Sequence, residues 1–503
     1  MIKSNGGIIG PDNVTTGGAF GSASGVFKLG EVTDLIKESK WPTAGPQGYQ
    51  SANSCRFNDG SSDNLSRTQE SSANSQIFTY STWVKRSGIT GAKQEMASGG
   101  SASTDFDMFY FDASERLSYY SKTSNSENLD LATTRVFRDV SAWYHIVLSV
   151  DTTQGTASNR IKLYVNGVQE TSFATGTYPS VNTNLFLNKA SQSQRIGRQA
   201  YSAIDFFDGY MAETVLIDGS QLAPTSFGEE NSQTGIWVPK VVTGLTFGTN
   251  GFYLPFTNAS ALGEDFSGND NDFTVNNLTS IDQSTDTCST NFATLNPLDN
   301  YYFGGTFSNG NITALSNSSG YSFCTSTMGV SSGKWYVEAK WDSGTNLLFG
   351  VTGQLATSNT QGMGNVAGSI AYGSGGARRL NGAYTASWGD TYSTGDILSI
   401  ALDLDNNKAY FAKNGTYQNS SNPSTGSNGE TITSASDTVI GSYFFGFSDN
   451  SSSATSTVSF NFGSPPFAIS SGNTDGNGFG NFEYAVPSGY LSLNTKNLAA
   501  VLA

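Results

Sequence analysis

The chain has 503 residues, of which only 13% are charged and 12% are aromatic, and this excludes the highly charged, weakly hydrophobic class of disordered proteins. Its 26 Lys and Arg against 41 Asp and Glu give a net charge of −15, so its surface repels phosphate backbones and we expect no nucleic-acid partner. The 57 glycines, 32 phenylalanines and 23 tyrosines, among many Ser, Thr and Asn residues, predict an all-β protein of about three domains.

Targeting segments and cysteines narrow the class of protein further. No stretch approaches the roughly 20 apolar residues that cross a bilayer, and the first residues lack the apolar region of a signal peptide. We therefore expect neither membrane insertion nor export by a signal of its own. Cys55, Cys288 and Cys324 are odd in number and irregularly spaced, which argues against a disulfide framework or a zinc site and predicts reduced, mostly buried thiols.

Residues 1–48 form a predicted N-terminal arm. They are rich in Gly, Ser and Thr at first, and then Val32, Leu35 and Ile36 have the i, i+3, i+4 spacing of one short helix that ends before Pro42. A helix this short is marginal in water, so we expect it to form against a partner surface. A disordered leader without a role is the alternative.

Short alternating runs begin near residue 49 and indicate strands. In the first run, Phe78, Tyr80, Thr82 and Val84 share one face, as in a half-buried strand. Asn-Gly within the third run is the strongest short hairpin signal, and the last two runs suggest a further strand pair. The predicted strands are 78–85, 143–151, 161–169, 195–198 and 207–217.

These runs carry a family resemblance. In order they read Phe-Thr-Tyr-Ser-Thr-Trp-Val, Trp-Tyr-His-Ile-Val, Ile-Lys-Leu-Tyr-Val-Asn-Gly, Ile-Gly-Arg and Phe-Asp-Gly-Tyr-Met-Ala-Glu. This order resembles the laminin-G-like, concanavalin-A-like jelly roll, and we assign it to residues 49–234. The resemblance implies two antiparallel sheets face to face, with ligands bound on a concave face or at the loop rim, but fold alone does not define the ligand.

A β-rich connector is predicted over residues 235–299, with a short strand at 251–256. Its polar cluster at 265–272, which includes Asp265 and Asp270, offers spaced oxygen ligands around a glycine. The spacing misses the helix-loop-helix calcium pattern and lacks a final bidentate Glu. We therefore predict an ordinary turn and no cofactor, and leave a calcium ion open as the alternative.

A second family resemblance covers residues 300–463. The run Gly333-Lys334-Trp335-Tyr336, an aspartate-rich turn leading to Lys413-Asn414-Gly415, and the closing Asn461-Phe462-Gly463 stand in the order of a SPRY domain. This resemblance implies a second β-sandwich that binds protein partners through loops on one edge. The predicted architecture is thus all-β: two tandem antiparallel β-sandwiches, a concanavalin-A-like jelly roll and then a SPRY-like one, with an N-terminal arm and a C-terminal tail over 464–503.

The whole arrangement resembles virion proteins of tailed bacteriophages, especially marine ones. It includes the arm with Lys40-Trp41-Pro42, both sandwiches and the linker at 291–297. The resemblance implies a location on the virion, on a tail appendage rather than the capsid surface, after synthesis in the host cytoplasm. It also implies docking to other virion proteins through residues 1–48 and a homo-oligomer, with a trimer as one form, although no heptad run predicts a coiled coil.

Catalytic patterns are sparse in the sequence. His145 is the single histidine, and it is predicted to pack on a strand or at its rim because no acidic or nucleophilic partner adjoins it. Glycoside hydrolysis needs two carboxylates on one face, and the Glu-x-Asp-x-x-Glu run of jelly-roll glucanases is absent. Asp105 and Asp107 share a strand face and are weak ligand candidates. We therefore predict no enzyme activity.

Sugar platforms use exposed aromatic rings flanked by Asn, Asp or Gln, because the ring covers the apolar face of the sugar while polar side chains bind its hydroxyls. The loop aromatics predicted to fit this description are Tyr119, Tyr120, Tyr178, Tyr201, Tyr384, Trp388 and Tyr417. The leading hypothesis is a non-enzymatic tail fibre or similar appendage that contacts host-surface glycan or protein. A capsid decoration or tail-knob component without its own ligand is the second, and a polysaccharide-degrading enzyme the third.

Overall fold

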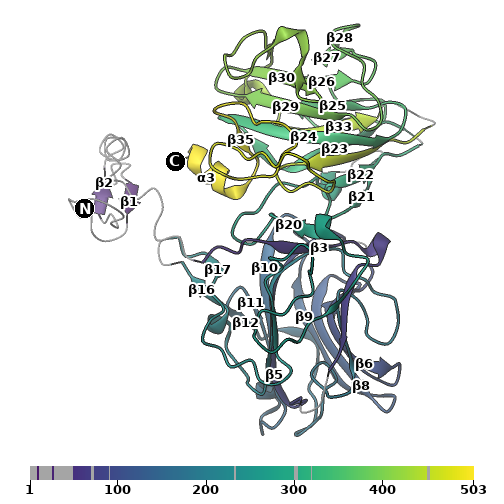
Figure 1. Cartoon of the computed structure of the whole chain (residues 1–503), viewed down its shortest axis with the longest axis vertical. Helices are drawn as coiled ribbons and strands as arrows, with labels where there is room; N and C mark the ends of the chain where they lie inside the picture. Colours follow the sequence, from purple (N-terminus) through teal and green to yellow (C-terminus); the bar gives the residue numbers. More distant parts are fainter. Residues whose placement is uncertain are drawn as a thin grey trace. The chain divides into compact units, whose positions relative to one another are not determined.

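The computed structural model describes residues 8–10, 25–27, 49–69, 73–89, 91–231, 234–299, 304–318, 320–449 and 454–502 (Figure 1). The helix predicted before Pro42 lies outside these residues. The chain divides into a smaller unit, Met1–Gln50 with Ala223–Leu245, and a larger one, Ser51–Leu222 with Thr246–Ala503. Among the described residues, no helix is long and apolar enough to cross a membrane.

The smaller unit contains two two-stranded antiparallel sheets: β1 (Ile8–Gly10) pairs with β2 (Gly25–Phe27), and β16 (Gly228–Glu230) pairs with β17 (Trp237–Pro239). Helices are short throughout the described residues. They are α2 (Ala157–Arg160), α3 (Thr495–Leu502), and the 3-10 turns η1 (Asp59–Ser61), η2 (Pro224–Ser226), η3 (Ser280–Asp282), η4 (Pro297–Asp299), η5 (Gln418–Ser420) and η6 (Ala435–Asp437).

Two sheets form the first sandwich of the larger unit. One sheet has the order β12 (Val168–Glu170), β11 (Ile161–Val165), β10 (Trp143–Asp151), β5 (Ile77–Arg86), β15 (Gly209–Asp218), β3 (Ser54–Phe57), β20 (Gln283–Ser284), with β18 (Phe252–Leu254) paired to β15. The other has the order β13 (Phe173–Thr177), β9 (Ser126–Val136), β8 (Arg116–Thr123), β7 (Asp105–Phe111), β6 (Gln94–Ala102), β14 (Ser193–Ile196), β4 (Asn64–Thr68), β19 (Thr274–Asn276).

The core of this sandwich lies between its sheets. Side chains alternate along a strand, so one set from each sheet points inward. Tyr80 of β5 meets Phe109 of β7 edge to face at 6.0 Å between ring centroids. The strand predicted at 78–85 is present, but it is buried on both faces rather than one. Its outer face is covered because Thr79 Oγ1 donates to Ser220 O (2.7 Å) and Lys85 pairs with Asp286 (2.8 Å).

The predicted Asn-Gly turn is confirmed in this sandwich, but one predicted pair of neighbouring strands is wrong. Asn166 and Gly167, at φ 49° and 80°, join β11 to β12 as a tight hairpin, and few other residue types adopt these angles. The runs predicted as a strand pair are β14 and β15, which lie in different sheets. The segment between them, residues 197–208, crosses from one sheet to the other, which sequence alternation alone does not reveal.

The second sandwich also has two sheets. One has the order β21 (Thr306–Ser308), β22 (Thr313–Leu315), β34 (Thr457–Asn461), β24 (Lys334–Ser343), β29 (Ile397–Asp403), β30 (Lys408–Lys413), β31 (Thr416–Tyr417), with β32 (Glu430–Thr431) paired to β30 and β35 (Leu491–Ser492) parallel to β24. The other has the order β23 (Ser322–Val330), β33 (Tyr443–Asp449), β25 (Leu348–Thr352), β26 (Ser369–Gly373), β27 (Arg378–Leu380), β28 (Ala383–Thr385).

Aromatic side chains fill the core of the second sandwich. Phe349 and Phe460, one from each sheet, meet at 5.6 Å, and Trp335 is almost fully buried beside them. The C-terminal segment belongs to this packing, because Leu493 is buried in the same core and α3 places Leu498 and Val501 against it. The predicted fold class is confirmed: the larger unit contains two antiparallel β-sandwiches in tandem.

Hydrogen bonds join the two sandwiches within the larger unit. The buried pair of Lys85 and Asp286 also binds Asn291 Oδ1 (2.7 Å) and Phe292 O (3.0 Å) through Lys85 Nζ. Gly310, at φ 68° between β21 and β22, approaches Tyr210, whose hydroxyl donates to Gly310 O (3.0 Å). A Cβ on Gly310 would lie 2.2 Å from the Tyr210 hydroxyl oxygen, so glycine is required there.

Candidate functional site

Tyr119 and Tyr120 are consecutive residues of β8, so their side chains point to opposite faces of the sheet. Tyr119 points into the core, where it is fully buried and its hydroxyl donates to Asp107 Oδ2 (2.9 Å). The prediction of Tyr119 as an exposed loop aromatic is therefore wrong, because residues 116–123 form a strand. Tyr120 points to the outer face and is half-buried.

Tyr120 and Tyr201, predicted separately, come together on the outer face around Phe106. The ring centroid of Phe106 lies 5.9 Å from that of Tyr120 and 4.6 Å from that of Tyr201. Phe106, Met108 and Tyr110 alternate along β7 and are buried in this cluster, while Tyr120 and Tyr201 remain half-exposed at its edge. The structure thus builds a small aromatic platform on a sheet face.

Strand register places acidic side chains beside these rings. Met108 of β7 lies opposite Tyr120 of β8, which lies opposite Asp130 of β9. On the other side, Tyr110 of β7 lies opposite Glu95 of β6. Directly opposite residues in a sheet have Cβ atoms about 5 Å apart, so each carboxylate borders a ring. We call the set Glu95, Phe106, Met108, Tyr110, Tyr120, Asp130 and Tyr201 the tyrosine face.

A loop over residues 198–206 covers part of the tyrosine face and positions Tyr201. The Arg198 guanidinium donates to Ser202 O (2.8 Å) within the loop, and Ser98 Oγ of β6 donates to Arg198 O (2.7 Å). At the other end, Glu95 N donates to Asp205 O (3.0 Å). Both ends of the loop are therefore tied to β6, which holds the Tyr201 ring against Phe106.

Glu95 has an unusual electrostatic environment. It is fully buried, and neither of its carboxylate oxygens has a hydrogen-bond partner among the described residues. Burial, and then the negative charge of Asp205, raise the pKa of Glu95 well above its ordinary value, and nearby Lys93 opposes the shift. Burial thus favours the protonated form of Glu95, which lies opposite Tyr110 in the sheet.

The two tyrosines at the edge keep their hydroxyl protons. Burial, followed by the charge of Glu127, raises the pKa of Tyr120, and burial followed by the charge of Asp205 raises the pKa of Tyr201. Each can therefore donate a hydrogen bond as well as offer a ring face. Asp130, which is half-buried, supplies an acceptor beside them. Rings, hydroxyl donors and carboxylate acceptors together suit a polyhydroxylated ligand.

A second exposed aromatic site lies on the second sandwich. Tyr384 in β28 is 62% exposed, and the Arg379 guanidinium carbon lies 5.5 Å from its ring centroid. Arg378 pairs with Glu430, which also accepts from Trp388 Nε1 (2.7 Å). We call Arg378, Arg379, Tyr384, Trp388 and Glu430 the arginine rim.

The remaining predicted aromatics serve mainly in packing. Trp388 meets Tyr372 edge to face at 5.4 Å, and Tyr178 meets Phe173 at 6.3 Å. Tyr417 packs with buried Tyr336 and Tyr410, and burial raises its pKa far above its ordinary value. The structure therefore does not bring Tyr178, Trp388 and Tyr417 together as one sugar platform.

Asp105 and Asp107 differ in their surroundings. Asp105 lies at the start of β7 near solvent, where its carboxylate accepts from Thr104 Oγ1 (2.7 Å) and Ser124 N (3.0 Å). Asp107 is fully buried, accepts from Tyr119 and Leu187, and burial raises its pKa to about 6. Across the described ranges, no three His, Cys, Asp or Glu side chains form a group that could hold a metal ion.

The cluster at 265–272 has the hydrogen bonding of a turn. Asp265 Oδ1 accepts from the backbone N–H groups of Tyr253 (2.8 Å) and Ser267 (2.8 Å), and Oδ2 accepts from Asn271 N (2.9 Å). Asp270 is exposed at φ 58°, a left-handed turn position. The oxygens of Asp265 that could ligate calcium are thus occupied by backbone donors.

His145 is packed inside the fold, as predicted. It is fully buried in β10, Nε2 lies 2.9 Å from Ser81 Oγ, and its ring stacks on Trp83 at 4.8 Å. Burial lowers the pKa of His145 to about 3, so the ring is neutral at physiological pH.

Sequence reasoning missed Glu95, Phe106, Met108 and Tyr110. One signal was present, because β7 ends in the uninterrupted apolar and aromatic run 108–111, which indicates a strand covered on both faces. Glu95 carried no signal, because its burial depends on the loop over 198–206, which is distant in sequence.

Comparison with known proteins identifies the sandwich that carries the tyrosine face. Residues 59–221 match the family model of the Concanavalin A-like lectin/glucanases superfamily. This segment therefore has the predicted lectin-like jelly-roll fold, which is used for binding carbohydrate or protein. No curated protein gave a significant sequence match.

Several solved structures are similar to parts of the chain. The SPRY domain of human HERC1 is 15% identical, covering 29% of this chain and 86% of that one, with a TM-score of 0.23. Another human SPRY domain is 19% identical, covering 30% and 90%, with a TM-score of 0.22. A heptameric SAP-like pentraxin from Limulus polyphemus is 14% identical, covering 39% and 100%, with a TM-score of 0.26.

Proposed function

We propose that the chain is a non-enzymatic binding protein of a tailed-bacteriophage particle, part of a tail fibre or similar appendage, that contacts host-surface glycan through the tyrosine face. The observation that carries the binding role is the convergence of Tyr120 and Tyr201 around Phe106, with Asp130 directly opposite Tyr120. The composition and the order of domains along the sequence support the virion location.

The charges around the tyrosine face define the ligand class. Asp130, Asp205 and Glu127 border the rings and outnumber the ammonium of Lys93, whose Nζ lies 5.3 Å from the Tyr110 ring centroid; the chain as a whole carries a net charge of −15. Sulfated or acidic sugars would be repelled by this surface. The ligand is therefore a neutral or amine-bearing glycan, whose hydroxyls the carboxylates accept and whose apolar faces lie on the tyrosine rings.

Imaging of intact particles tests the virion location. Cryo-electron microscopy combined with a labelled antibody against this chain should place two sandwich-sized densities in tandem on the tail. Density on the capsid lattice would instead support a decoration role without a ligand, and absence of the chain from purified particles would contradict the virion assignment.

Docking of the arm is tested separately. We expect residues 1–48 to bind other virion proteins, so a chain lacking them should not be incorporated into particles while it still binds glycan. Incorporation of the shortened chain at the level of the full chain would contradict this part of the proposal.

The non-enzymatic character has its own assay. Incubation of the full chain with neutral host-surface polysaccharides should leave their chain length unchanged, measured by size-exclusion chromatography. Shortening that disappears in Glu95→Gln or Asp130→Asn would show that the acidic residues of the tyrosine face catalyse hydrolysis.

A further inference from the structure

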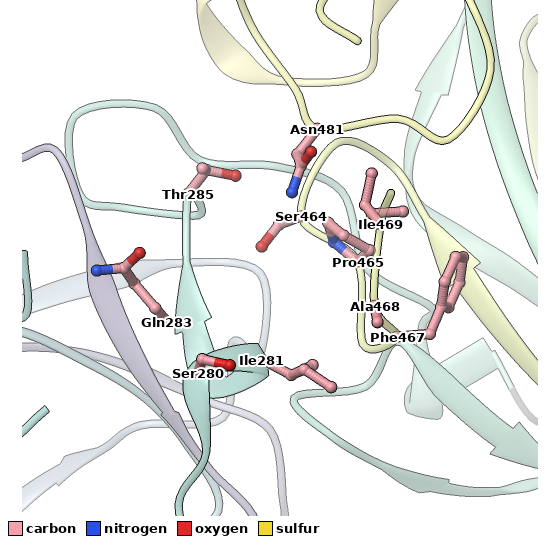
Figure 2. A pocket seen from close by; sticks show the side chains of 10 residues that line it. All are labelled: Ser280, Ile281, Gln283, Thr285, Ser464, Pro465, Phe467, Ala468, Ile469 and Asn481. Carbon is pink, nitrogen blue, oxygen red and sulfur yellow. The ribbon is translucent and has the colours of Figure 1, made fainter. Parts of the chain in front are cut away.

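A pocket of 240 Å³ opens within the larger unit, between the segment before β20 and the segment after β34 (Figure 2). One wall comes from Ile281, Gln283 and Thr285, and the other comes from Ser464, Phe467 and Asn481 with their neighbours. These walls belong to parts of the chain that are far apart in sequence. The pocket is separate from the tyrosine face and the arginine rim.

Buried hydrogen bonds tie the two walls together. Arg56, which is almost fully buried, donates to Ile281 O on one wall (2.8 Å) and to Pro465 O on the other (3.3 Å). Ser284 Oγ and Ser464 Oγ lie 2.6 Å apart, and Thr285 Oγ1 donates to Gly463 O (3.0 Å). The shape of the pocket is therefore set before any ligand arrives, which reduces the entropy cost of binding.

The side chains that line the pocket are uncharged, although Lys340 Nζ, outside the lining, lies 5.7 Å from the Phe467 ring centroid. Figure 2 shows polar and apolar side chains interspersed around the pocket: Ser464 and Asn481 lie beside Pro465 and Ile469, and Ser280 lies beside Ile281. Within the described part of the chain, the side-chain amide of Asn481 makes no hydrogen bond, so both its donor and its acceptor are available. Apolar side chains interspersed with a few hydroxyl and amide groups are the usual composition of a small-molecule site.

The volume of the pocket and its uncharged lining limit the kind of ligand that it can bind. Pockets for drug-sized molecules occupy about 300–1,000 Å³, so a volume of 240 Å³ suits a smaller ligand. An uncharged lining offers no partner to an ionised group, and burying one without a partner is costly. We propose that this pocket binds a single neutral sugar unit, with its hydroxyls on Asn481, Thr285 and Ser464 and its apolar face on Phe467 and Ile281.

Such a unit has two sources, a free monosaccharide or the terminal residue of a glycan. The proposal does not rest on the function assigned to the tyrosine face, and the test separates the two sites. Saturation-transfer NMR on the full chain, with neutral monosaccharides and with oligosaccharides that end in them, reports which form binds. Titration calorimetry then gives the dissociation constants.

Matched variants locate the binding. Asn481→Ala should weaken the affinity about tenfold, the loss expected for a buried hydrogen-bonded contact. Ala468→Phe, which places a ring in the pocket opening, should abolish binding. Asn359→Ala, at an exposed asparagine that does not line the pocket, should leave this affinity unchanged.

Binding of a monosaccharide that both pocket variants reduce supports the proposal with a free sugar as ligand. Binding of oligosaccharides alone, reduced in the same way, supports it with a terminal residue. Absence of any saturation transfer, or affinities that are equal in all variants, would overturn the pocket site while leaving the tyrosine face untouched. Loss of binding in Tyr120→Ala alone would assign the sugar to the tyrosine face and overturn the proposal.

Discussion

The tyrosine face and the arginine rim both expose tyrosine rings, but they are built in opposite ways. On the tyrosine face, Tyr120 projects from a central strand and rests on an almost completely buried aromatic cluster. On the arginine rim, Tyr384 is 62% exposed on the edge strand β28 and stands beside one arginine. Sites on central strands are held more precisely than sites at edges and loops, so the tyrosine face is the better preorganised of the two.

The tyrosine face and the arginine rim also differ in the charged groups around them. Carboxylates border the tyrosine face, whereas Arg378 and Arg379 give the arginine rim two guanidinium groups, one of them neutralised by Glu430. Guanidinium groups bind carboxylates through bidentate hydrogen bonds. The contrast supports the proposal that a neutral glycan binds the tyrosine face and not the arginine rim.

The largest expected effect is on stability, and it should differ between the inward-facing Tyr119 and the outward-facing Tyr120 of β8. Tyr119→Ala removes a fully buried ring and its hydrogen bond to Asp107, so we expect a loss of about 3–5 kcal/mol in the free energy of unfolding. Tyr120→Ala removes a half-buried ring from the outer face and should cost about 1 kcal/mol. Urea unfolding monitored by fluorescence measures both, and equal losses would contradict the assignment of faces.

A pH-dependent effect is expected from Glu95. Its folded-state pKa is raised, so the folded state keeps a proton that the unfolded state releases above about pH 4.3. Stability conferred by this group is complete below that pH and falls as pH rises toward the folded pKa, by at most about 1.4 kcal/mol per pH unit. Glu95→Gln should flatten this decline in the free energy of unfolding measured with urea, and an unchanged profile would contradict the raised pKa of Glu95.

A smaller effect is expected on the arginine rim. Glu430→Ala removes the carboxylate that pairs with Arg378 and accepts from the Trp388 indole, but Arg378 keeps its hydrogen bond to Thr385 Oγ1 (2.8 Å) and these groups are only partly buried. We expect a loss of about 1 kcal/mol in the free energy of unfolding. Glu430→Gln, which keeps an acceptor for Trp388, should lose less, and a loss for Glu430→Ala as large as that for Tyr119→Ala would show that the rim is as rigid as the tyrosine face.

The sequence revealed the strands and tight turns because these depend on local patterns. Asn166-Gly167 adopts positive φ angles that few other residues tolerate, and alternation identified strands such as β5. The layer of each strand was not predictable, as β14 and β15 show, because sheet membership depends on contacts distant in sequence.

The candidate site was only partly predictable for the same reason. Composition suggested exposed tyrosines, and two of them, Tyr120 and Tyr201, meet around Phe106. Neighbouring Tyr119 was misplaced, because a shift of one residue in a strand exchanges the buried face for the outer one. Glu95 could not be found, since its buried state results from a loop that joins a different strand.

The measurement that tests the central claim most directly is a glycan-array screen of the full chain, followed by calorimetric titration of the best neutral ligand. The account predicts that Tyr120→Ala and Tyr201→Ala each weaken binding about tenfold or more, as expected for ring-stacking contacts, while Tyr384→Ala leaves it unchanged. Binding that depends on Tyr384 and not on Tyr120 or Tyr201, or a preference for sulfated or acidic glycans, would contradict it.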